Sequence, residues 1–119
     1  MKAYTDIEQS KKLVEILPLD SADGYWFKGF PPQPYMVYTK GTPNPGEHIP
    51  CWSVVALLNF IKDTCSYFEL VYLSSTIDGR ANRLENVYRL STVTHDVYEN
   101  ELIDACYEMI IKLHEQKLL

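Results

Sequence analysis

The stretch that decides the fold is "HIPCWSVVALLNFI", which runs from His48 to Ile61. Ser53 stands where a helix N-cap belongs, because its hydroxyl can accept a hydrogen bond from an orphan backbone amide. Trp52 directly precedes this cap and is placed to pack back on the first turn near Leu57. Apolar residues then recur at helical spacing, namely Val54, Leu57, Leu58 and Ile61. We therefore expect an amphipathic helix that begins at Ser53 and ends near Lys62.

Two further helices are predicted, one on each side of this stretch. The first follows a cap at Thr5 or Asp6 and stops before Pro18, since a residue that precedes proline avoids the helical region. The second lies in "NELIDACYEMIIKLHEQKLL", where Asn100 is the expected cap and Asp104 lies in the first turn. Its apolar stripe consists of Leu102, Ile103, Cys106, Met109, Ile110 and Leu113.

Four short segments read as strands, namely "YWFKGF", "PYMVYTK", "SYFELVYLSST" and "LENVYRLSTV". Both faces of "FELVYL" are apolar, so we place this strand centrally in the sheet. Residues 40–50 read as a long loop that is rich in proline and glycine. The prediction is an α+β fold in a single domain, 1–119, with the order α-β-β-α-β-β-α. Its two layers are an antiparallel sheet and helices mainly on one face of that sheet.

Composition restricts the functional classes. The formal net charge of −5 disfavours binding to phosphate backbones, and the basic residues cluster only weakly at Arg80, Arg83 and Arg89. We therefore expect no nucleic-acid partner. The sequence has no signal-peptide core and no apolar run long enough to cross a membrane, so we expect a cytoplasmic protein without a membrane partner. The three cysteines are an odd count, which favours free thiols in a reducing compartment.

Catalytic and metal sites have weak support in the sequence. Cys51 precedes a helix N-terminus, which lowers the pKa of a thiol, and His48 is a candidate base nearby. A zinc site would need about four ligands, but the next thiol, Cys65, lies beyond a whole helix. We expect no metal and no cofactor. A small thiol-dependent enzyme centred on Cys51 with His48 is kept as the alternative.

The aromatic side chains are the strongest functional signal. Four of them crowd onto the first two predicted strands, namely Tyr25, Trp26, Tyr35 and Tyr38. Because they occupy both faces, half of them should be covered by the loop 40–50 or should contact a partner. We predict a small non-enzymatic intracellular module that binds another protein, or itself as a homodimer, through this aromatic sheet surface.

Two stretches of the chain resemble a family of short uncharacterised proteins from gut bacteria and their phages or mobile elements. "IPCWSVVALL" is similar to that family's central I-P-x-W-S-x-x-x-L-L, and "LIDACYEMI" is similar to its closing helix L-I-D-A-x-x-E-M-I. The family often has tryptophan at the position of Lys112 in this chain. The resemblance implies an accessory protein encoded by a phage or mobile element, and it implies no catalytic residues or ligand.

Overall fold

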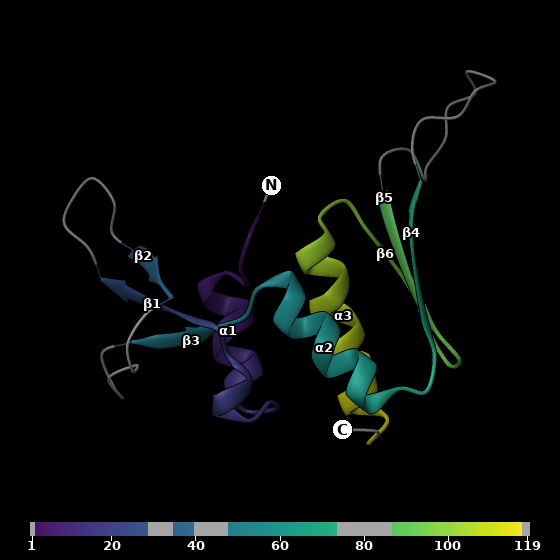
Figure 1. Cartoon of the computed structure of the whole chain (residues 1–119), viewed down its shortest axis with the longest axis horizontal. Coiled ribbons are helices and arrows are strands. Elements are labelled where there is room, and N and C mark those ends of the chain that lie inside the picture. The colour runs from purple at the N-terminus through teal and green to yellow at the C-terminus, as the bar shows by residue number, and fades with distance from the viewer. Residues whose placement is uncertain (1, 29–34, 40–47, 74–86, 118–119) are drawn as a thin grey trace.

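The predicted α+β class is confirmed by a computed structural model, which describes residues 2–28, 35–39, 48–73 and 87–117 (Figure 1). The helices are α1 (Ile7–Val14), α2 (Val54–Thr64) and α3 (Leu102–Glu115), with a short 3₁₀ helix at Leu19–Ser21. The strands are β1 (Gly24–Lys28), β2 (Tyr35–Tyr38), β3 (Ile49–Cys51), β4 (Phe68–Leu73), β5 (Val87–Thr92) and β6 (Asp96–Glu99).

The strands form two antiparallel sheets where the sequence predicts one. The first sheet has the order β2-β1-β3 and the second has the order β4-β5-β6. Strands β3 and β6 are additions to the predicted order α-β-β-α-β-β-α. Strand β3 has only three residues, and the four residues of β6, DVYE, do not alternate between apolar and polar, so neither shows a strand pattern in the sequence.

Two of the three predicted helix starts are confirmed. Asp6 caps α1 and forms a capping box with Gln9, whose side chain accepts a hydrogen bond from the Asp6 amide at 3.0 Å. Ser53 caps α2, as expected, and accepts a hydrogen bond from the amide of Ala56 at 3.2 Å. Asn100 does not cap α3, because the helix begins one residue later than predicted: the backbone of Glu101 is still extended, and Glu101 occupies the cap position without a side-chain cap bond.

The helices lie between the two sheets (Figure 1), where α1 runs beside β3 and α3 packs against β5 and β6. One core joins the three helices to the second sheet. Its buried members are Leu13, Leu17, Trp52, Leu57, Ile61, Leu90, Val97, Ile103, Ala105, Cys106, Met109, Ile110 and Leu113. Trp52 is completely buried in this core, and its Nε1 donates a hydrogen bond to the Ser21 hydroxyl at 2.9 Å. The tryptophan of the opening stretch therefore secures α2 within the core.

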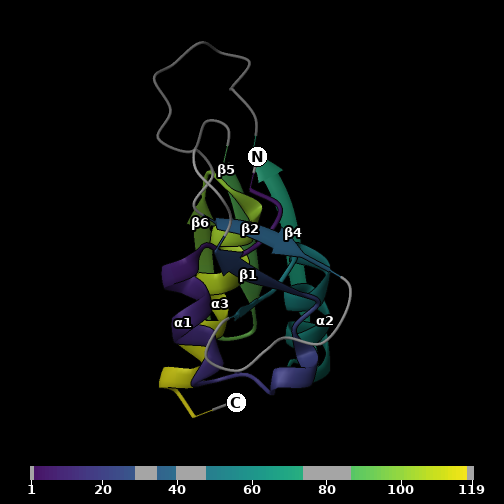
Figure 2. The same ribbon diagram turned by 90° about the vertical axis from the view of Figure 1, so that its left-hand side faces the viewer.

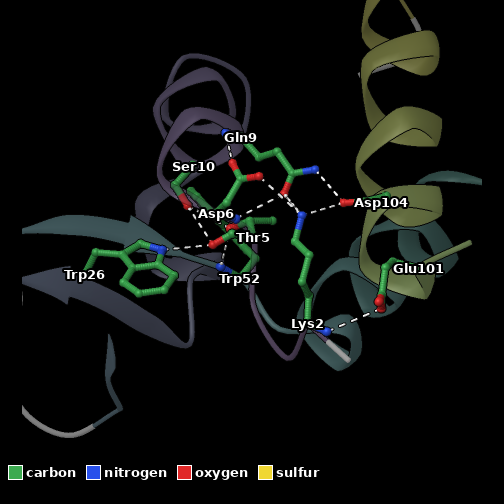
Figure 3. A network of polar contacts seen from close by, with 9 residues as sticks. All are labelled: Lys2, Thr5, Asp6, Gln9, Ser10, Trp26, Trp52, Glu101 and Asp104. Carbon is green, nitrogen blue, oxygen red and sulfur yellow. Dashed lines mark hydrogen bonds and ion pairs between the residues drawn. The ribbon is translucent and has the colours of Figure 1, made fainter. Parts of the chain in front are cut away.

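The segment that precedes α1 connects α1 to the start of α3 (Figure 3). The Lys2 ammonium lies 2.7 Å from Asp104 Oδ1 at the start of α3, 3.2 Å from Asp6 Oδ2 and 3.3 Å from Gln9 Oε1. We call these four residues the Lys2 clamp. The Thr5 amide adds a hydrogen bond of 2.9 Å to the carbonyl of Trp52. These contacts fix α1 against the first turn of α3.

Candidate functional site

The aromatic residues that the sequence singled out lie in the first sheet. Tyr25 is only 8% exposed, and its ring centroid lies 4.8 Å from that of His48. Trp26 is half-buried and its Nε1 donates a hydrogen bond to the Thr5 carbonyl at 2.8 Å (Figure 3). Tyr35 and Tyr38 belong to β2, where they pair with Lys28 and Tyr25, and their side chains lie outside the described part of the structure. Tyr25 and Trp26 therefore hold the first sheet in place.

Cys51 is completely buried at the end of β3. Burial, and after it the negative charge of Asp23, raises the pKa of its thiol to about 12. The alternation of side chains along β3 places Cys51 on the opposite face from the His48 ring, which lies against Tyr25 and Phe27. Burial thus outweighs the effect of the nearby helix N-terminus, and the thiol stays protonated, which is the reverse of what a nucleophile needs.

The other candidate groups do not form a chemical centre. Burial raises the pKa of the Cys106 thiol to about 12, and it also raises the pKa of the half-buried Cys65. Among the described residues, no three histidine, cysteine or carboxylate side chains are grouped so that they could hold a metal ion. Arg89 is engaged with Glu69, whereas Arg80 and Arg83 lie outside the described residues. No described helix combines the length and the apolar character that a membrane span requires.

Among the described strands, β4 lies at an edge of the second sheet and β5 is the central strand, so the prediction that β4 is central is wrong. Two of its apolar side chains are exposed, whereas Phe68, Val71 and Leu73 are half-buried. Leu70 is 36% exposed and Tyr72 is 51% exposed, and Tyr67, which directly precedes the strand, is 50% exposed. The pattern that indicated burial on both faces therefore belongs to an edge strand in which Leu70 and Tyr72 are exposed.

The face of the second sheet that points toward the helices is only partly covered. Leu70 pairs with the core residue Leu90, so Leu70, Tyr72 and Tyr88 all lie on this face. The rings of Tyr72 and Tyr88 are neighbours, with centroids 4.8 Å apart and planes tilted by 50°. Figure 2 shows that β4 rises above the start of α2, beyond the cover of that helix. We call Leu70, Tyr72 and Tyr88 the tyrosine patch.

Negative charge borders the tyrosine patch. Glu99 in β6 is the direct cross-strand partner of Tyr88, and its side chain is half-buried. Burial, and after it the charges of Glu108 and Asp104, raises the pKa of Glu99. Asp104 is paired with Lys2 in the clamp, but in the described part of the chain no ion pair engages Glu99 or Glu108. The patch thus lies beside negative charge that the described part of the fold leaves unbalanced.

The opposite face of this sheet carries a polar pair and two more tyrosines. Arg89 Nη2 lies 2.6 Å from Glu69 Oε1, and the Tyr67 hydroxyl donates a hydrogen bond of 3.0 Å to Glu69 Oε2. Tyr98 in β6 is opposite Arg89 and is 43% exposed. None of the described helices covers this face (Figure 1). The contacts of Arg89 and Tyr67 both use the carboxylate of Glu69, which is the one charged residue of β4.

The sequence predicts β4 as a strand. Its residue pattern does not say whether the strand lies at the edge or in the centre of a sheet. Comparisons with protein-family models, with curated proteins and with solved structures give no match for this chain. The functional argument therefore depends on the geometry of the second sheet.

Proposed function

We propose that this chain is a small non-enzymatic module that binds protein through the second sheet, with β4 as the contact strand. The partner is either another protein or a second copy of the chain, and the setting is the interior of a cell, as an accessory protein of a phage or mobile element. One observation carries the proposal: an edge strand of six residues presents the exposed apolar side chains of Leu70 and Tyr72.

The sequence of β4 has few of the features that protect an edge strand from pairing. Natural edge strands are usually protected by lysine, by proline, by unpaired charges or by short length. Strand β4 contains none of these except Glu69, whose carboxylate is engaged by Arg89 and Tyr67. The other edge, β6, has only four residues and includes the acidic Asp96 and Glu99. A strand from a partner can therefore extend the sheet at β4 through backbone hydrogen bonds, a common mode of peptide recognition.

A second copy of the chain is one candidate for this partner. In an antiparallel pairing of two β4 strands centred on Val71, Leu70 of each copy lies opposite Tyr72 of the other copy. Aromatic and aliphatic cross-strand pairs of this kind are stabilising, and this register places Glu69 opposite Leu73, so no like charges face each other directly.

Sedimentation velocity over a concentration series, combined with affinity capture, tests the proposal. Leu70→Lys and Tyr72→Lys place a charge on the edge and should abolish self-association or capture of a partner. Leu19→Lys is the matched control, because Leu19 is 59% exposed but lies in the 3₁₀ helix, far from the second sheet in the sequence. A wild-type chain that remains monomeric, and that captures the same proteins as both β4 variants, would contradict the proposal.

The alternative function, a thiol-dependent enzyme centred on Cys51 and His48, has no structural observation in its favour. The buried thiol and its pKa of about 12 count against an activated nucleophile.

A further inference from the structure

We infer that the tyrosine patch binds an extended basic peptide segment, with an arginine or lysine side chain held over the rings of Tyr72 and Tyr88 and against the carboxylate of Glu99. This inference depends on the proposed function, since it uses the same sheet, and it narrows the partner to a positively charged protein segment.

The two tyrosine rings form a platform that suits a cation. Their centroids are 4.8 Å apart, and Tyr72 exposes 51% of its surface. A guanidinium or ammonium group is attracted to the face of a tyrosine ring when it lies within about 6 Å of the centroid. A strand added beside β4 would lie about 4.8 Å from it, and its residue opposite Tyr72 would point to the same face. The stem of a long basic side chain would then lie across the ring of Tyr72.

The charges around the patch select a cation over an anion. Because Glu99 is the cross-strand partner of Tyr88, the Cβ atoms of the two residues are about 5 Å apart. A cation above Tyr88 therefore comes within reach of the Glu99 carboxylate, and Glu108 adds negative charge nearby. In the free protein burial, and after it repulsion from the charges of Glu108 and Asp104, raises the pKa of Glu99. A basic segment would relieve this repulsion.

The same charges favour a different protein over a second copy at this face. The chain has a formal net charge of −5, and a second copy would bring the same negative charge to the patch. A basic segment is instead attracted over a distance, which raises the rate of encounter at low salt. This complementarity is the reason why we assign the patch to a basic partner.

The probes are three capped, fluorescently labelled peptides in which valine alternates with arginine, with citrulline or with glutamate. Citrulline keeps the shape and most hydrogen-bonding groups of arginine but carries no charge. We expect fluorescence anisotropy at low salt to show binding of the arginine peptide, about tenfold weaker binding of the citrulline peptide and no binding of the glutamate peptide.

Variants of the full chain test the two parts of the site. Tyr72→Leu keeps apolar surface but removes the ring, and should weaken binding of the arginine peptide about fivefold. Glu99→Gln should weaken it about threefold. Glu15→Gln makes the same change in net charge at an exposed position that follows α1, and should leave the affinity unchanged. Thermal melts of each variant confirm that the fold is intact.

Three outcomes would overturn the inference: no binding of the arginine peptide at low salt, equal binding of the arginine and citrulline peptides, or equal effects of Glu99→Gln and Glu15→Gln. If Leu70→Lys still abolishes self-association or partner capture in that case, the proposed function stands and only the basic partner is refuted. If the arginine peptide binds but Leu70→Lys has no effect on binding, the proposed contact through β4 is refuted.

Discussion

The start of α2 allows a quantitative prediction, because the side chains of Ser53 and Asp23 both form hydrogen bonds there. The Ser53 hydroxyl accepts a hydrogen bond from the Ala56 amide at 3.2 Å and donates one to Asp23 Oδ2. Asp23 Oδ1 accepts a further hydrogen bond from the Ser53 amide at 2.8 Å. Asp23 precedes β1, so these bonds also connect the first sheet to α2.

Replacing Ser53 with alanine removes the cap and the hydroxyl contact to Asp23. Loss of an N-cap costs about 1 kcal/mol, and a hydrogen bond to an exposed carboxylate adds about 0.5 kcal/mol. We therefore expect Ser53→Ala to lower the free energy of unfolding by about 1.5 kcal/mol. For a chain of this size, that corresponds to a fall in Tm of about 6 °C. Asp23→Ala loses two hydrogen bonds at an exposed site and should cost about 1 kcal/mol.

The double variant distinguishes a shared cap from two independent contacts. Because the bond between the two side chains is counted in each single variant, the double variant should cost about 0.5 kcal/mol less than the sum. Urea titrations followed by far-UV circular dichroism measure the free energy of unfolding of the wild type, the two single variants and the double variant. Ser66→Ala, an exposed serine outside the helices, is the control and should change stability by less than about 0.5 kcal/mol. Strictly additive costs, or a cost of Ser53→Ala equal to that of Ser66→Ala, would refute the reasoning.

Three more predictions follow from buried and clamped groups. Iodoacetamide should label the half-buried Cys65 of the native protein well before Cys51, because Cys51 is completely buried and its pKa of about 12 leaves only a very small fraction of thiolate up to pH 9; rapid labelling of Cys51 near pH 8.5 would contradict this. Lys2→Met should cost about 1 kcal/mol in urea titrations at low salt and less at high salt, since it leaves Asp104 without its ion pair; a salt-independent cost would speak against the clamp. Trp52→Ala should cost about 4 kcal/mol in the same titrations, and a cost below about 2 kcal/mol would argue against its place in the core.

Local signals allowed the helix starts to be predicted. The caps at Asp6 and Ser53 depend on residues within one turn of the helix, so the sequence contains the whole interaction. The prediction at Asn100 was wrong because the number of extended residues between β6 and α3 depends on how the sheet meets the helix. The number of residues in that connection cannot be derived from the spacing of residues in the sequence.

Strand placement depended on partners that lie far away in the sequence. The apolar pattern of β4 predicted a central strand, but whether a strand lies at an edge is decided by pairing with other segments. For the same reason the sequence assigned functional weight to Tyr25 and Trp26, which the structure places in contact with His48 and Thr5. The tyrosine patch includes Leu70 and Tyr72, whose exposure became visible only with the sheet order.

The Lys2 clamp has a consequence for synthesis of the chain on the ribosome. Lys2 and Asp104 are 102 positions apart, and Leu13 and Leu17 belong to the same buried cluster as residues of α3. Before α3 has been synthesised, the ammonium of Lys2 lacks Asp104, which is one of its two carboxylate partners. The buried cluster that contains Leu13 and Leu17 is also incomplete, because it lacks the residues of α3. The first helix therefore completes its packing only after α3 has left the exit tunnel.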